Sequence, residues 1–174
     1  SLCHQSASEV RPIMTKEWQH QLTNDGFVIG RGPFSETLID QLLSVSHKRI
    51  QVVMDALEDK PIGIGSAAGY DEVVQRSPGR WDLPISPAEF GVDDHDLPWW
   101  PLVAASLGPE AEHSFSGVVY SEPDTPAQEW HIDSPHESAE HLPLHAVNVL
   151  VALQDVSMEM GPTAFARGSH RLTN

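Results

Sequence analysis

Apolar residues in the first half of the chain recur at helical intervals. Over residues 35–57 they fall mostly three or four positions apart, at Leu38, Leu42, Val45, Ile50, Val53, Met54 and Leu57. Residues at this spacing share one face of an α-helix, so the pattern predicts a long amphipathic helix. A shorter helix is predicted from an N-cap at Thr15 to Asn24-Asp25-Gly26, before a short strand over residues 27–29.

Glycine and proline break up the middle of the chain. Gly63, Gly65 and Gly69, with Pro61 and Pro78, predict a loop over residues 61–80. These glycines are not followed by the Lys-Ser/Thr pair of a phosphate-binding loop, which argues against a nucleotide site. A strand is predicted over residues 80–85 and a helix over residues 99–107, which starts near Pro98 and stops at Gly108-Pro109.

The second half alternates short apolar runs with turn-forming segments. Strands are predicted over residues 114–121, 129–133, 145–155 and 163–166. Strands with long loops after a helical lead favour a mainly β fold with N-terminal helices, a jelly-roll-like barrel. We expect a single domain over residues 1–174, with a helical and loop lead over 1–113 and a strand-rich barrel part over 114–174.

Composition and charge exclude several classes of partner. The formal net charge of −15 argues against nucleic acid and against an anionic membrane surface. One cysteine, Cys3, excludes an internal disulfide and a zinc–thiolate site. No apolar run approaches the roughly 18 residues of a membrane span. We therefore expect a soluble, cytoplasmic protein.

The candidate chemistry lies in the segment Gln128-Glu129-Trp130-His131-Ile132-Asp133. In a strand, alternate side chains share a face, so His131 and Asp133 would emerge together. One imidazole and one carboxylate suit a mid-series divalent metal, and two histidines with one carboxylate are the ligands of non-haem Fe(II) oxygenases. The alternative is a surface ion pair or a structural hydrogen bond.

Other polar residues have two interpretations each. Asn148 lies in an apolar strand, where it needs a partner, either a co-substrate or a core hydrogen bond. Arg80 could bind a carboxylate or pair with Asp82, and Gln128 could reach a bound acid or end a strand in solvent. Trp130 alternates with His131 and is expected in the core.

Five short motifs occur in a characteristic order. They are Gly-Phe-Val-Ile from Gly26, Trp-His-x-Asp from Trp130, a strand from Asn148 that closes in Leu-Gln-Asp-Val, Glu-Met-Gly-Pro-Thr from Glu159, and Arg-Gly-Ser-His-Arg from Arg167. The ordered set resembles the phytanoyl-CoA dioxygenase family over residues 15–174. The resemblance implies a double-stranded β-helix of the cupin type, and oxidation of a C–H bond with Fe(II), O2 and 2-oxoglutarate. It makes His131 and Asp133 the first two iron ligands. Gln128, Asn148 and Arg80 are candidate co-substrate contacts by their residue types and positions.

The chain departs from the family after its Gly-Ser-His turn. There the family's second histidine ligand and its 2-oxoglutarate-binding basic residue lie well downstream, whereas only residues 171–174 follow here. We expect a truncated family member that lacks its last strands. His170 is expected to hydrogen-bond backbone, the orientation of His145 is open, and His136 and His141 lie on an acidic loop expected to form a solvated flap.

The resulting functional hypothesis is an Fe(II)- and 2-oxoglutarate-dependent hydroxylase of a small organic substrate. Two alternatives remain, a non-catalytic barrel that acts as a binding module and a cupin-type metalloenzyme of another reaction. A pocket lined by Trp81, Trp99 and Trp100 is expected, although it does not identify the substrate. The acidic surplus disfavours a coenzyme A ester, because the one basic cluster, residues 47–49, is expected on a solvated helix face. The sequence does not determine the oligomeric state.

Overall fold

The computed structural model describes residues 16–30, 34–57, 73–91, 93, 96–133 and 143–172. The helices are α1 (Lys16–Asp25), α2 (Glu36–Leu57), α3 (Pro87–Phe90) and α4 (Trp100–Leu107), and the strands are β1 (Val74–Ser77), β2 (Arg80–Pro84) and β3 (Gly117–Ser121). Two 3-10 turns, Met158–Met160 and Ser169–Arg171, follow later in the chain.

The three strands form one antiparallel sheet in the order β1-β2-β3. β2 pairs with β3 without interruption, from Arg80 opposite Ser121 to Pro84 opposite Gly117. β1 and β2 form a hairpin whose register shifts between Gln75 and Ser77. A β-bulge of this kind increases local twist, and it lies next to the Pro78-Gly79 turn, where Gly79 has a φ of +78°.

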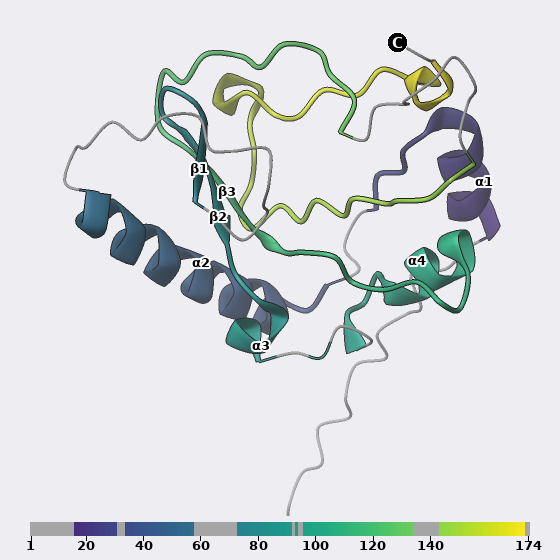
Figure 1. Cartoon of the computed structure of the whole chain (residues 1–174), viewed down its shortest axis with the longest axis horizontal. Helices are drawn as coiled ribbons and strands as arrows, with labels where there is room; N and C mark the ends of the chain where they lie inside the picture. The colour runs from purple at the N-terminus through teal and green to yellow at the C-terminus, as the bar shows by residue number, and fades with distance from the viewer. Residues whose placement is uncertain are drawn as a thin grey trace, which may run out of the picture.

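The core lies between α2 and the sheet. Val53 of α2 packs with Trp81 and Leu83 of β2, and Leu83 is only 1% exposed. Partly buried apolar residues of α2 and β3, among them Ile50, Met54 and Val118, pack against this cluster. In Figure 1, α2 runs below the strands along much of its length. The apolar stripe predicted from the sequence is thus the face that α2 buries.

The structure confirms the predicted helices over residues 35–57 and 99–107 and the strand over residues 80–85, each within one or two residues. α1 confirms the first predicted helix, although its proposed N-cap Thr15 lies outside the described residues. Residues 61–72 of the predicted loop lie outside the described residues, and the prediction is wrong over Val74–Ser77, which forms β1. Val74 is buried there, so packing against the sheet stabilises the strand beside the turn residues Pro78-Gly79.

Several other predicted strands are wrong. Residues 27–29, 129–133, 145–155 and 163–166 run as irregular chain, so the described residues form helices and one small sheet. A strand needs a neighbour for its backbone hydrogen bonds, and a local apolar pattern does not supply one. Leu150 is 63% exposed in such a segment. The double-stranded β-helix stays a prediction.

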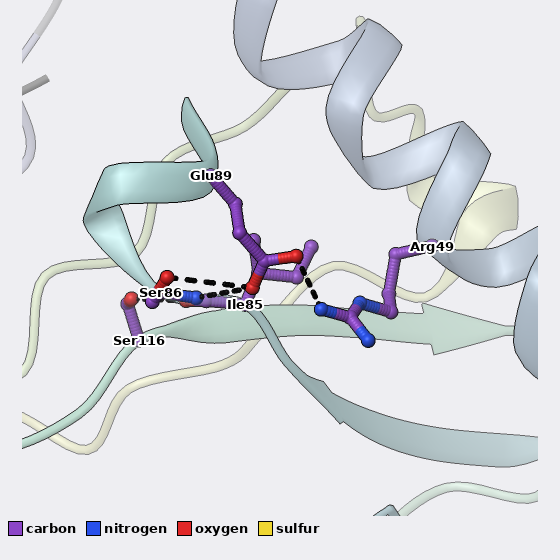
Figure 2. Close-up of polar contacts among 5 residues, drawn as sticks. All are labelled: Arg49, Ile85, Ser86, Glu89 and Ser116. Carbon is purple, nitrogen blue, oxygen red and sulfur yellow. Dashed lines mark hydrogen bonds and ion pairs between the residues drawn. The ribbon is translucent and has the colours of Figure 1, made fainter. Parts of the chain in front are cut away.

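A polar network joins α2, α3 and the end of β2, as Figure 2 shows. The Ser86 backbone N–H donates to the Glu89 carboxylate at 3.0 Å, and Arg49 of α2 forms an ion pair with the same carboxylate. The Ser116 hydroxyl donates to the Ile85 carbonyl. The first turn of α3 is therefore held to α2 by Arg49, and Ser116 fixes the residue before the Ser86 N-cap.

We predict that Leu83→Ala destabilises the fold by about 2–5 kcal/mol, because it leaves a cavity where α2 meets β2. Urea unfolding of the variant and the wild type measures this loss. Leu150→Ala is the matched control, since exposed positions usually change stability by less than about 0.5 kcal/mol. Equal losses in the two variants would contradict this placement of the core.

We predict a pH-dependent stability difference between the wild type and Glu89→Gln. The Ser86 backbone N–H, with Arg49, holds the pKa of Glu89 below its ordinary value of 4.5. A lowered pKa means that the stabilisation is present above pH 4.5 and is lost as the pH falls through the folded-state pKa.

Denaturant unfolding of both proteins between neutral and acid pH measures this difference. Other carboxylates titrate in both proteins and cancel from the comparison. The wild type should be more stable near neutrality, and the gap should narrow on acidification below pH 4.5. A gap that stays constant across this range would show that Glu89 has no such role.

Candidate metal site

The β1–β2 turn holds the chain that leads to the candidate site. The Gly79 carbonyl accepts the backbone N–H of Glu122 at 2.8 Å and the Thr125 hydroxyl at 3.0 Å. A Cβ at residue 79 would lie 2.6 Å from the Thr125 hydroxyl oxygen, so glycine allows this close approach. The turn after β3 is therefore fixed against the hairpin just before residues 128–133.

Arg80 strengthens the same attachment. Its Nη1 donates to the Pro126 carbonyl at 3.2 Å and its Nε donates to the Ser121 hydroxyl at 3.3 Å. The alternative that Arg80 pairs with Asp82 is wrong, because Asp82 forms its ion pair with Arg76 at 2.6 Å. The Arg80 guanidinium thus binds the chain that enters the site.

His131 and Asp133 converge as the sequence predicts, although the segment is not a strand. His131 Nε2 lies 3.3 Å from Asp133 Oδ1, and the two side chains are 53% and 62% exposed. Both side chains are accessible from solvent. The pair is therefore open to an ion or a small molecule.

A backbone carbonyl orients the His131 ring. Nδ1 lies 2.8 Å from the Glu129 carbonyl oxygen, which can only accept, so Nδ1 carries the proton. In the neutral imidazole, Nε2 then has a free lone pair that faces Asp133. Metal-bound histidines commonly have this arrangement, in which the second ring nitrogen donates to a carbonyl or carboxylate.

Asn148 holds the other side of the carboxylate. Its Nδ2 donates to Asp133 Oδ2 at 2.6 Å, and the two residues are 15 positions apart in sequence. Asn148 thus makes a hydrogen bond within the protein, as one of its two sequence interpretations held. Asn148 and Asp133 are both exposed, however, so this hydrogen bond does not lie in the core. Oδ1 is left to face His131.

One aromatic prediction is wrong. Trp130 is 73% exposed and does not pack in the core, since the strand alternation on which that prediction depended is absent. Trp81 lies in the core against α2, and the tryptophan-lined pocket stays a prediction. Trp99 meets Phe34 edge to face, with ring centroids 5.6 Å apart. Gln128 is exposed three residues before His131.

The described residues contain no group of three or more His, Cys, Asp or Glu side chains that could hold a metal. They therefore supply no third ligand for His131 and Asp133. His145 is described, and its Nδ1 contacts the Pro143 carbonyl at 3.0 Å. His136 and His141, with the acidic flap predicted around them, lie outside the described residues.

His170 contacts backbone, as predicted, in a cluster that we call the α1 clasp. His170 Nε2 donates to the Thr23 carbonyl at 3.2 Å, Arg171 Nη2 donates to the same oxygen at 2.9 Å, and Gly168 N donates to the Asp25 carbonyl at 2.8 Å. These donors satisfy carbonyls at the end of α1, where positive charge is also favourable. Figure 1 shows the last turn lying beside α1.

A neutral imidazole nitrogen and a carboxylate oxygen, each oriented by a hydrogen bond, are two of the ligand types found at non-haem metal sites. The chain belongs to the phytanoyl-CoA dioxygenase family, whose sequence profile matches residues 22–174. Comparison with curated proteins and with solved structures gave no match. No helix in the described part of the chain is long and apolar enough to cross a membrane.

We predict that Gly26→Ala destabilises the α1 clasp more than Gly161→Ala destabilises its own turn. Both glycines have positive φ, +83° and +68°, which costs an alanine about 1–2 kcal/mol. A Cβ at residue 26 would also lie 2.3 Å from His170 Nδ1, whereas one at residue 161 meets nothing within 4 Å. Urea unfolding measures both losses, and equal losses would show that the clasp tolerates the methyl group.

Proposed function

We propose that this chain is an Fe(II)- and 2-oxoglutarate-dependent dioxygenase that hydroxylates a small organic substrate. Membership of the phytanoyl-CoA dioxygenase family supports the reaction class. The paired donors of His131 and Asp133 support the position of the metal. Because Asp133 is a carboxylate rather than a small residue, the proposed reaction is hydroxylation, not halogenation.

The pairing of His131 Nε2 with Asp133 Oδ1 at 3.3 Å is the observation that carries the proposal. With the proton on Nδ1, Nε2 and the carboxylate oxygen both present lone pairs to the space between them, which a divalent metal can bind. Two adjacent ligands, each about 2.1 Å from a divalent ion, lie about 3.0 Å apart at a right angle, so the two atoms need only a small movement to bind one ion.

Each residue then has a definite part. His131 and Asp133 would hold iron, and the bound iron with 2-oxoglutarate would supply the activation of O2. The Glu129 carbonyl keeps His131 in the tautomer that leaves Nε2 free. Arg80 fixes the incoming chain through Pro126, and the exposed Gln128 is a candidate contact for the co-substrate. A third protein ligand would come from outside the described residues.

The proposed substrate is not a strongly anionic ester. Arg49, one member of the basic cluster at residues 47–49, already forms an ion pair with Glu89. His47 and Lys48 are exposed on α2. With a formal net charge of −15, the chain would repel a coenzyme A ester at long range. A neutral or cationic small molecule fits this charge better, with O2 as the second reactant.

We predict that the chain forms a chromophoric complex with Fe(II) and 2-oxoglutarate under anaerobic conditions. The metal-to-ligand charge-transfer band of this chelate should saturate with added co-substrate, and His131→Ala and Asp133→Ala should abolish it, because each removes one proposed ligand. Titration followed by visible absorption measures the band without knowledge of the substrate.

His20→Ala is the matched control for His131→Ala. His20 is an α1 residue whose Nε2 contacts Asn24, so its loss changes a histidine without touching the site. The control should keep the band, and circular dichroism should show that all variants fold. Absence of the band in the folded wild type would contradict the proposed function. Turnover with Mn(II) or Zn(II) and no 2-oxoglutarate would instead favour a metalloenzyme of another reaction.

A further inference from the structure

Asn148 is a polar residue next to the proposed metal site whose role neither family membership nor the ligand pair explains. It lies on the segment over residues 143–150, separate from the segment that carries His131 and Asp133. Its amide Nδ2 lies 2.6 Å from Asp133 Oδ2, the shortest separation among the hydrogen bonds described above at this site. The contact joins two irregular segments of the chain.

The two oxygens of Asp133 therefore have different surroundings. Oδ2 accepts the Asn148 amide, and Oδ1 lies 3.3 Å from His131 Nε2. Rotation about the last bond of an aspartate side chain is soft and roughly two-fold, so an unrestrained carboxylate exchanges its oxygens easily. A hydrogen bond to one oxygen removes that freedom. It also weakens the bonded oxygen as a metal ligand, because one of its lone pairs is engaged.

We propose that Asn148 is a positioning residue that restricts Asp133 to one-oxygen coordination through Oδ1. The inference rests on the proposed function, since it needs a metal held by His131 and Asp133. If both carboxylate oxygens bound the ion, one further coordination position would be filled. By holding Oδ2 away, Asn148 keeps that position for the co-substrate or O2. Asn148 thus acts through Asp133 and does not itself contact the co-substrate.

The expected size of the effect follows from other metal sites. Removing a hydrogen-bond partner of a metal ligand typically weakens metal affinity 10- to 100-fold. Asn148 and Asp133 are both exposed, so solvent competes for their hydrogen bond and the lower half of that range is expected. The coordination mode should change as well, and this change separates positioning from a general loss of structure.

The experiment titrates Co(II) into the whole chain without substrate. Calorimetry gives the affinity, and the visible d–d absorption of Co(II) reports the number of ligands, since higher coordination gives weaker bands. Asn148→Leu removes the amide at nearly constant size, and Asn148→Gln keeps an amide on a longer arm. We expect about 10-fold weaker binding and a changed spectrum for Asn148→Leu, with partial recovery in Asn148→Gln.

Asn24→Ala is the control. The Asn24 amide also makes a side-chain hydrogen bond, to His20 Nε2 at 2.8 Å, but within α1. This variant should match the wild type in both measurements. Thermal unfolding checks that each variant folds, and Asn148→Ser replaces Asn148→Leu if the apolar side chain prevents folding.

The outcomes separate the two proposals. If His131→Ala abolishes Co(II) binding while Asn148→Leu keeps the wild-type affinity and spectrum, the positioning role is overturned and the metal site survives. If the folded wild type shows no His131-dependent Co(II) binding, the proposed function fails and the inference fails with it. Weaker binding with a changed spectrum in Asn148→Leu alone supports the inference.

Discussion

The burial of β2 between its two neighbouring strands and α2 is the constraint on which the described structure depends. Trp81 and Leu83 face Val53 of the helix, while the backbone of the same strand pairs with β1 on one edge and β3 on the other. Gly117 allows the closest part of this pairing, because a Cβ there would lie 2.7 Å from the Leu83 carbonyl oxygen. Side-chain packing and backbone hydrogen bonds both fix the strand. The residues at its two ends therefore have defined positions.

The candidate site takes its position from the start of that strand. Gly79 and Arg80 precede the buried part of β2, and both bind the turn after β3, Gly79 through its backbone carbonyl and Arg80 through its guanidinium. The chain from Thr125 to His131 then runs only a few residues without secondary structure. Local hydrogen bonds order the side chains of this site, whereas on a strand the backbone hydrogen bonds of the sheet would also hold them. The site is therefore less rigid than one built on a strand. The contacts from Glu129 and Asn148 are therefore important for the donor geometry.

The sequence predicted those features that a periodic pattern or a short motif marks by itself. The stripe of α2 identifies its buried face by itself, and the Trp-His-x-Asp order identified the paired donors of His131 and Asp133. The strand over residues 145–155 was wrong, because an apolar run needs a neighbouring strand and the described residues do not provide one. The role of Asn148 was also not predictable from the sequence. Its partner lies 15 residues away on an irregular segment, where no periodic pattern points to it.

His131 and His170 show why a histidine in a family motif does not identify a ligand. Both rings donate to a backbone carbonyl, from Nδ1 in His131 and from Nε2 in His170. The difference is what surrounds the ring. His131 is half exposed and turns its second nitrogen toward a carboxylate, whereas His170 packs so closely on Gly26 that a single methyl group there would collide with it. A cation can approach the first ring and has no room beside the second on its Gly26 side. Access and the neighbouring charge, rather than the residue type, therefore favour His131 as the metal ligand and His170 as part of the α1 clasp.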